Sequence, residues 1–97
     1  MNMQAMLKQA QNMQREMLKE QEIITNTEFF GNNGLVKVTM KGDKKLEKVE
    51  IDKSFEKDDI DMLEDMIVLA VNDALTQIDK MTEEKMGKYT KGIPGLF

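Results

Sequence analysis

The chain of 97 residues contains no cysteine, no histidine and no tryptophan. It therefore lacks the commonest general base, the thiolate nucleophile and the usual zinc ligands. The single serine, Ser54, follows Asp52 and Lys53 in a segment typical of a turn that leaves a strand, and a catalytic role is the weaker alternative. The sequence also has no glycine-rich phosphate loop or calcium-loop pattern. We expect a protein that is not an enzyme, with no cofactor, no metal and no small-molecule substrate.

Long hydrophobic runs are also missing, and the longest falls far short of the roughly 20 residues that a membrane-spanning helix needs. Residues 1–10 lack the basic start and continuous apolar stretch of a secretory signal. The absence of cysteine agrees with a cytosolic location, because small secreted domains often depend on disulfides. We therefore expect a cytoplasmic protein with no membrane association.

The residues that are present describe one small folded domain over residues 1–97, with 40% hydrophobic and 33% charged residues. A chain of this length buries only about two-thirds of the surface that its unfolded form exposes. Self-association would complete a core that one chain cannot build. We expect a homodimer, since a two-fold pair is the commonest assembly.

The first predicted element is a helix of about 30 Å over residues 3–23, which contain good helix formers and neither glycine nor proline. Methionine and alanine recur at spacings of three and four, which is typical of a heptad seam. Ordinary core packing is one interpretation of this seam, and an adaptable Met-rich binding surface is the other. We expect the seam to form a dimer interface. Its residues are Met3, Met6, Ala10, Met13 and Met17.

Three strands follow, and the sequence predicts them at residues 25–30, 35–40 and 46–52. The residues at 31–34, Gly-Asn-Asn-Gly, indicate the first hairpin turn, and Gly42-Asp43 indicates the second. The result is an antiparallel β-meander. Alternation in the second and third strands predicts one apolar face and one wet face. The predicted inward residues are Val36, Val38, Met40, Val49 and Ile51.

A second long helix is predicted to begin at Asp58 or Asp59, either of which can cap it. Its wide apolar stripe predicts that it packs on the sheet. Gly87 is expected to end it, and residues 88–97 are expected to form a flexible tail. The apolar end of that tail, Leu96-Phe97, is either a frayed end or a docking peptide. The stripe comprises Ile60, Leu63, Ile67, Ala70, Val71, Ala74, Leu75, Ile78 and Met81.

Charge is unevenly distributed along the chain, although its net value is -4 and its pI is about 4.8. Residues 58–79 hold seven acidic residues and no Lys or Arg. Residues 37–57 hold seven Lys against five acidic residues, and residues 80–97 hold four Lys against two. The acidic balance argues weakly against nucleic acid as a partner. A local basic strip can still bind phosphates, because counterion release depends on contacts made in one place.

The whole chain resembles the YbaB/EbfC family of nucleoid-associated proteins. Five separated stretches carry the resemblance in the right order. They are residues 6–14 (MLKQAQNMQ), 34–42 (GLVKVTMKG), 51–52 (ID), 64–75 (EDMIVLAVNDAL) and 84–87 (EKMG) before 94–97 (PGLF). Asn32 and Asn33 replace the glycines usual in the first hairpin. Glu47 and Glu50 stand where similar proteins often have Lys or neutral residues, which moves the expected DNA contacts toward the helix ends.

This resemblance implies an α+β fold with a long N-terminal helix, a three-stranded antiparallel meander and a long C-terminal helix. It also implies a homodimer in the bacterial cytoplasm that binds double-stranded DNA of the nucleoid with low sequence specificity, with possible effects on nucleoid organisation and gene expression. The alternative is a protein-interaction or structural dimer whose DNA contact is incidental. As single residues, the expected DNA contacts can equally be solvated surface charges. They are Lys8, Arg15, Lys19, Lys85, Lys88 and Lys91.

Overall fold

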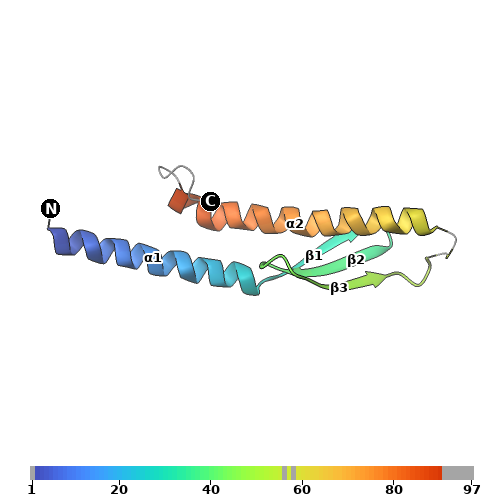
Figure 1. Cartoon of the computed structure of the whole chain (residues 1–97), viewed down its shortest axis with the longest axis horizontal. Coiled ribbons are helices and arrows are strands. Elements are labelled where there is room, and N and C mark those ends of the chain that lie inside the picture. The colour runs from blue at the N-terminus through green and yellow to red at the C-terminus, as the bar shows by residue number, and fades with distance from the viewer. Residues whose placement is uncertain (1, 56, 58, 91–97) are drawn as a thin grey trace.

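The structure is a computed structural model that describes residues 2–55, 57 and 59–90 (Figure 1). The predicted order of helix, three-stranded antiparallel meander and helix is confirmed, and the strands lie in the order β1-β2-β3. The two helices run antiparallel, and α2 covers the sheet while α1 extends away from it (Figure 1). The elements are α1 (Met3–Asn26), β1 (Glu28–Asn33), β2 (Val36–Lys41), β3 (Leu46–Ile51) and α2 (Ile60–Thr90).

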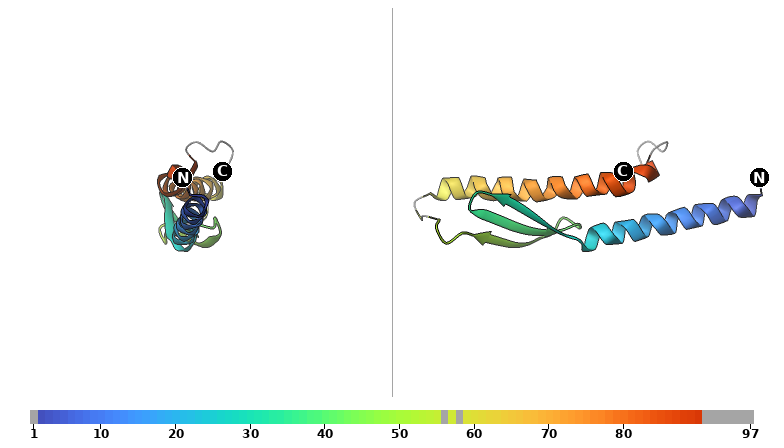
Figure 2. Two further views of the ribbon diagram at one scale, coloured as in Figure 1. Left: turned by 90° about the vertical axis from the view of Figure 1, so that its left-hand side faces the viewer. Right: turned by 180° about the vertical axis from the view of Figure 1, so that it is seen from behind.

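The molecule is long and thin, with principal extents of 70 × 22 × 14 Å (Figure 2). Its radius of gyration is 19.2 Å, whereas a compact chain of this length would have one of about 12.5 Å. The accessible surface is 7507 Å², against about 5,700 Å² for a folded monomer of the same mass. The single chain therefore leaves unusually large surface in contact with solvent.

Helix α1 begins at the side chain of Asn2, whose Oδ1 accepts a hydrogen bond from the Gln4 N–H at 2.9 Å. The helix continues through Asn26, three residues beyond its predicted end, and Thr27 closes it by donating its N–H to the Ile24 carbonyl. Ile24 is buried against Met86 and Tyr89 of α2. This packing outweighs the strand preference of the β-branched residues at the end of the helix.

Strand β1 therefore starts at Glu28, and the prediction that the first strand covers residues 25–30 was wrong. The predicted turn at residues 31–34 was also misplaced, because the hairpin turn is Gly34-Leu35 and Asn33 already pairs with Val36. Gly34 has a φ of 58°, as a tight hairpin requires at this position. Gly31 serves close packing, since a Cβ there would lie 1.9 Å from the Ala70 carbonyl oxygen.

The core lies between α2 and the first two strands. Val36, Val38 and Met40 of β2 are buried, as their alternation predicted, and so are Ala70, Ala74 and Ile78 of the α2 stripe. The remaining stripe residues are half-buried, except Ile60, which is exposed. Alanine at two central positions lets the helix axis come close to the sheet, which explains the tight contact at Gly31.

Strand β3 differs from its neighbours because every one of its residues is exposed. Val49 and Ile51 are the register partners of Val38 and Val36, so they share the face that α2 packs on. The prediction that they are buried was wrong nonetheless: 39% of Val49 and 44% of Ile51 remain exposed. The helix lies over β1 and β2, and a single helix is too narrow to cover the third strand as well.

Helix α2 begins after Asp59, whose carbonyl accepts the first helical hydrogen bond from the Leu63 N–H at 2.9 Å. The helix does not stop at Gly87, as predicted, but continues to Thr90, so residues 88–90 of the predicted flexible tail are helical. A glycine inside a helix costs about 1 kcal/mol. Burial of Tyr89 against Ile24 offsets that cost, since burying a large apolar side chain contributes about 1.5–3 kcal/mol. The rest of the predicted tail, residues 91–97, lies outside the described residues.

Candidate nucleic-acid interface

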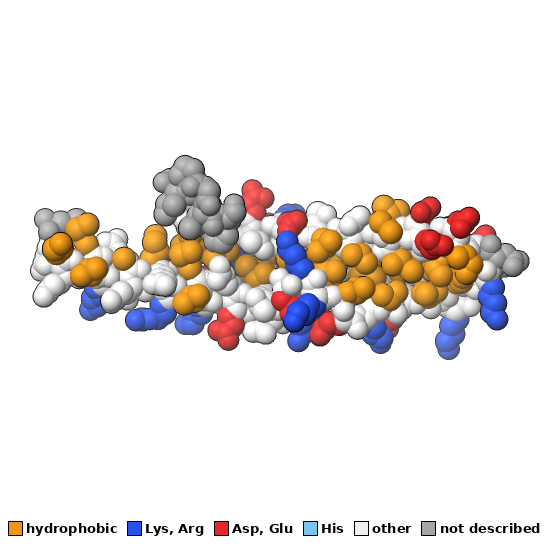
Figure 3. Space-filling view, in the orientation of Figure 1, with side chains coloured by type: hydrophobic (Ala, Val, Ile, Leu, Met, Phe, Trp, Pro, Cys, Tyr) orange, Lys and Arg blue, Asp and Glu red, His pale blue; other side chains and the backbone are white. Residues whose placement is uncertain are grey.

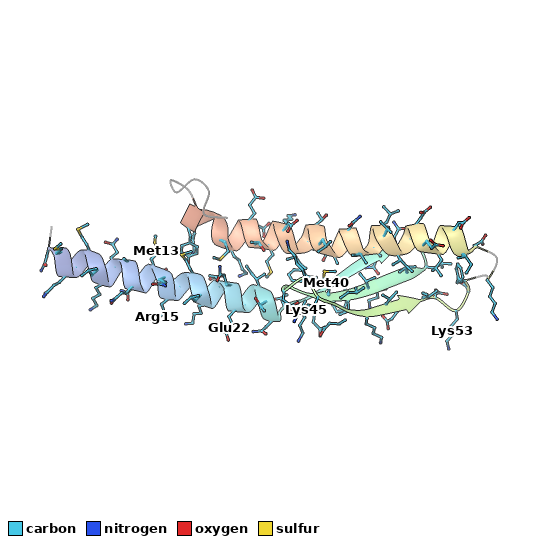
Figure 4. All side chains as sticks on the ribbon, in the orientation of Figure 1. Met13, Arg15, Glu22, Met40, Lys45 and Lys53 are labelled. Carbon is cyan, nitrogen blue, oxygen red and sulfur yellow. The ribbon has the colours of Figure 1, made fainter. Side chains whose placement is uncertain are left out.

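The three basic residues predicted on α1 lie on its surface. Lys8, Arg15 and Lys19 are all exposed. Arg15 points away from α2 (Figure 4). Helix α1 extends beyond the sheet, and its side opposite α2, on which Arg15 lies, is open to an extended partner (Figures 1 and 4).

The predicted basic residues of α2 are in a different situation. Lys85 is half-buried, and its Nζ lies 3.5 Å from Glu20 Oε2 of α1, so this ion pair joins the two helices. Lys88 is exposed and its Nζ lies 5.0 Å from the centre of the Tyr89 ring. Lys91 lies outside the described residues. The structure therefore brings Lys8 and Lys88 to one groove, described below, and uses Lys85 in helix packing.

Further basic side chains, which the sequence did not single out, share the exposed side of Arg15. Figure 3 shows Lys and Arg gathered along one long border of the molecule, from α1 past β3. In Figure 4, Lys45 in the second hairpin and Lys53 after β3 point the same way as Arg15, with Glu22 between them. We call Arg15, Lys45 and Lys53 the basic border. The excess of Lys in residues 37–57 was the sequence signal for these basic side chains. The side of the molecule on which each lysine lies depends on the course of the hairpin, which the sequence did not show.

Acidic side chains of α2 gather on the opposite border of the molecule (Figure 3). Lys44 faces that side, where its Nζ pairs with Asp79 Oδ1 at 3.3 Å. Its neighbour Lys45 is held in the hairpin by a hydrogen bond from its own N–H to Asp43 Oδ1. The positive φ of Lys44, 67°, reverses the chain here and sends the two lysines to opposite sides. The net charge of -4 thus hides one border rich in Lys and Arg and another rich in Asp and Glu.

The sheet face that points away from α2 carries a mixed set of charges. Lys48 Nζ pairs with Glu50 Oε1 at 3.0 Å, and this hydrogen bond and charge lower the pKa of Glu50. Lys37 Nζ lies 4.9 Å above the ring of Phe30. These cations already have partners within the chain. The face is therefore less suited to phosphates than the basic border, and the expectation drawn from Glu47 and Glu50 stays a prediction.

The turn after β3 is confirmed as the location of Ser54. Its N–H and its hydroxyl both donate to Asp52 Oδ1, at 2.8 and 2.7 Å. These two bonds hold the pKa of Asp52 below its usual value. The serine therefore stabilises the turn beside Lys53.

The seam predicted as a dimer interface is only partly used within the chain. Met17 is half-buried against the cluster of Ile24, Met86 and Tyr89, whereas the rest of the seam is exposed. Figure 4 shows Met13 on the side of α1 that faces the end of α2. The assignment of Met3, Met6, Ala10, Met13 and Met17 to a dimer interface stays a prediction.

A second apolar surface lies where β3 is left uncovered. Asp73 and Gln77 mark the flank of α2 that faces β1: Asp73 Oδ2 accepts from the Asn32 N–H at 3.0 Å, and Gln77 Nε2 donates to the Phe30 carbonyl at 2.7 Å. The opposite flank of α2 therefore faces β3, and Figure 3 shows a hydrophobic band in this region. We call this surface the open face. It comprises Leu46, Val49, Ile51, Val68, Val71 and Leu75.

Within the described ranges, neither helix combines the length and the apolar character needed to cross a membrane. The same residues contain no group of three or more acidic side chains placed to hold a metal ion.

Comparison with known proteins identifies the class. The family described as the YbaB/EbfC DNA-binding family matches residues 1–93, and the chain belongs to this family. A nucleoid-associated protein of Enterococcus faecalis is 48% identical over 98% of this chain and 94% of its own length. One of Lactobacillus acidophilus is 51% identical over 96% of this chain and 86% of its length. A nucleoid-associated protein of Lactococcus lactis subsp. cremoris is 48% identical over 97% of this chain and 98% of its own length. The resemblance noted in the sequence is therefore confirmed.

Proposed function

We propose that this protein is a homodimer that binds duplex DNA of the bacterial nucleoid, in the cytoplasm, with low sequence specificity. Membership of a DNA-binding family and relatives named as nucleoid-associated proteins support DNA as the partner. The observation that carries the proposal for the chain itself is the basic border, which is spatially separated from the acidic border of α2.

The dimer is supported by the open face. It exposes apolar side chains of β3 and α2 that the chain does not cover, and a contiguous apolar patch marks an interaction site. The chain also exposes about 1,800 Å² more surface than a folded monomer of its mass, which is more than twice the roughly 800 Å² that each partner loses in a standard interface. A second copy packed on the open face would complete the sheet core and leave both α1 helices projecting.

Two substitutions test the interface and compare it with the predicted seam. A glutamate at Val49 would place an unpaired charge in the interface if the open face is used, and a glutamate at Met13 would do the same for the seam. Sedimentation at micromolar concentration should show dissociation for Val49→Glu. Loss of the dimer in Met13→Glu alone would assign the interface to the seam, and a folded wild-type monomer would exclude the proposed dimer.

The mode of DNA binding follows from the elements available. The described residues form two long helices and a meander, and α2 is acidic on its outer side, so no evident element reads bases in the major groove. We propose contacts mainly to phosphates, made by the basic border together with Lys8 and Lys19. If each subunit neutralises two or three phosphates, log Kd against log salt concentration should have a slope of magnitude about 4 to 5.

Fluorescence anisotropy with random-sequence duplexes at a series of salt concentrations tests this mode. Arg15→Glu with Lys19→Glu should weaken binding to every duplex alike and reduce the salt slope, because contacts to phosphates position the protein without specifying a sequence. Lys44→Glu with Lys80→Glu is the matched control, since it changes the net charge equally beside the acidic helix. Equal losses in the two double variants would show a response to net charge only, and unchanged binding in the first would remove α1 from the DNA interface.

The alternative of a protein-interaction dimer is favoured by one observation, the exposed methionines in the first half of α1. Methionine is flexible and polarizable and suits adaptable recognition surfaces. Wild-type protein that fails to bind duplex at low salt, yet remains dimeric, would favour this alternative.

A further inference from the structure

The last turns of α1 and the last turns of α2 pack on each other in a small cluster of their own. Met17 and Ile24 of α1 lie against Met86 and Tyr89 of α2. The larger core lies between α2 and the sheet, and Met81 packs against both clusters. The direction in which α1 leaves the sheet therefore depends on a short contact that is separate from the main core.

An ion pair lies in the middle of this contact. Glu20 follows Met17 by three residues and precedes Ile24 by four, so the three side chains share one face of α1. Glu20 Oε2 lies 3.5 Å from Lys85 Nζ of α2. This oxygen is buried and has no hydrogen-bond partner among the described residues. Within that part of the chain, Lys85 is its only counter-charge.

Such a pair is sensitive to the loss of either member. Without the charge of Lys85, the Glu20 oxygen would be buried and uncompensated, which is costly. The least costly response is for α1 to move away from α2 until water reaches the carboxylate. Few apolar side chains oppose this movement, because the cluster around the pair is small.

The rest of α1 amplifies any such movement. The Gly42 N–H donates to the Thr27 carbonyl at 3.1 Å and fixes the end of α1 next to the sheet. Residues 2–16 are all exposed, and a groove of about 560 Å³ lies there between the helices, lined in part by Lys8 and Lys88. Helix α1 has 24 residues, so it is about 36 Å long and a tilt of about 10° moves its far end by about 6 Å. This exceeds the axial spacing of about 3.4 Å between phosphates of one DNA strand.

We infer that Glu20 and Lys85 are positioning residues: their ion pair sets the direction of α1 and thereby the place where Arg15 and Lys19 meet DNA. The inference rests on the proposed DNA binding. Lys85, one of the expected DNA contacts, then acts through α1 and does not touch phosphate. Arg15 lies on the side of α1 away from α2, so the pair can position it without joining the contact (Figure 4).

A neutral side chain at position 20 distinguishes positioning from charge, because the two predict effects of opposite sign. Glu20→Gln removes an acidic charge, which by charge alone would tighten DNA binding. If the pair positions α1, binding to random-sequence duplex should instead weaken roughly three- to tenfold, as for a coupled pair that loses one member. Glu16→Gln is the matched control, since Glu16 is exposed one turn earlier and has no ion-pair partner among the described residues. Fluorescence anisotropy measures both, and equal or tighter binding by Glu20→Gln would overturn the inference.

Exchanging the two charges separates positioning from direct contact. Lys85→Glu places two carboxylates against each other and should weaken binding roughly tenfold or more. Adding Glu20→Lys re-forms the pair at the parent's net charge and should return the affinity to within about twofold of the parent. Circular dichroism verifies that each variant keeps its helices. Binding that stays weak in the folded, exchanged chain would assign Lys85 to direct phosphate contact, against the inference.

A distance measurement tests the positioning without DNA. Nitroxide labels at Gln11→Cys and Glu83→Cys report the separation of two exposed sites on α1 and α2, in a chain with no other cysteine. Refolding with an excess of unlabelled chain leaves one labelled copy in most dimers. Glu20→Gln and Lys85→Glu should broaden the distance distribution or shift it by several ångströms, whereas Glu16→Gln should not. An unchanged distribution in the first two variants would overturn the inference, whereas a parent chain that binds no duplex would contradict only the proposed function.

Discussion

The two halves of the sheet follow the same sequence pattern but have opposite environments. Val38 in β2 is 0% exposed under α2, while its register partner Val49 in β3 is 39% exposed. Both are valines in a strand of alternating character, on the same sheet face. The difference arises because α2 lies over β1 and β2 only. Alternation therefore identifies which face of a strand is apolar, but the layer that covers this face can come from another chain.

The sharpest way to test this comparison is to place the same charge in each half. Val38→Glu should prevent folding, because it buries an unpaired carboxylate at the centre of the core. Val49→Glu should leave a folded chain with native helix content. Its melting temperature should fall, mainly because the proposed partner no longer binds. Circular dichroism melts at two protein concentrations measure both effects. Similar damage from both substitutions would mean that β3 belongs to the core of the single chain.

A smaller effect is expected where the covered half touches α2 most closely. Gly31→Ala should destabilise the chain by about 1–3 kcal/mol, because its Cβ overlaps the Ala70 carbonyl and the helix must move away. Gly87→Ala is the matched control: a Cβ there meets nothing within 4 Å, and it should stabilise α2 by about 0.5–1 kcal/mol. Urea unfolding of the three chains gives the free energies. A neutral Gly31→Ala would show that the strand and helix are not in such close contact.

The smallest effect is expected at the end of the uncovered strand. The folded pKa of Asp52 is lowered by the Ser54 N–H and then by its hydroxyl. The resulting stabilisation is present above the usual Asp pKa of about 3.9 and is lost as the pH falls through the lower folded value. Ser54→Ala should raise the Asp52 pKa part of the way toward its usual value and change stability only in this acid range. NMR titration of the Asp52 carboxyl measures the shift, and an unchanged pKa would assign the effect to the backbone N–H alone.

The elements that periodicity predicted well are those whose burial is decided within the chain. The alternation of Val36, Val38 and Met40, and the helical stripe through Ala70 and Ala74, are both found in the core. Local preference failed where tertiary contact decided the outcome. Burial of Ile24 extends α1 through residues with strand preference, and burial of Tyr89 carries α2 past Gly87.

The candidate interface was less accessible to sequence reasoning, since it depends on side-chain direction. Arg15 and Lys19 could be placed on an outer helix face from spacing alone. The ion pair of Lys85 with Glu20 could not be foreseen, because it joins residues from two helices far apart in the sequence. Lys44 and Lys45 are adjacent and chemically equal, yet a single positive φ separates them onto opposite sides.

The side chains that α2 places along β1 also distinguish the two edges of the sheet. Asp73 and Gln77 occupy the outward N–H of Asn32 and the outward carbonyl of Phe30, so a strand that joined β1 would have to displace these two hydrogen bonds. Of the two edge strands, β1 and β3, an incoming strand could therefore join β3 without displacing these two hydrogen bonds. If the proposed dimer joins two copies at β3 about a two-fold axis, neither copy keeps this edge for a third, so growth stops at the pair instead of continuing into a fibre.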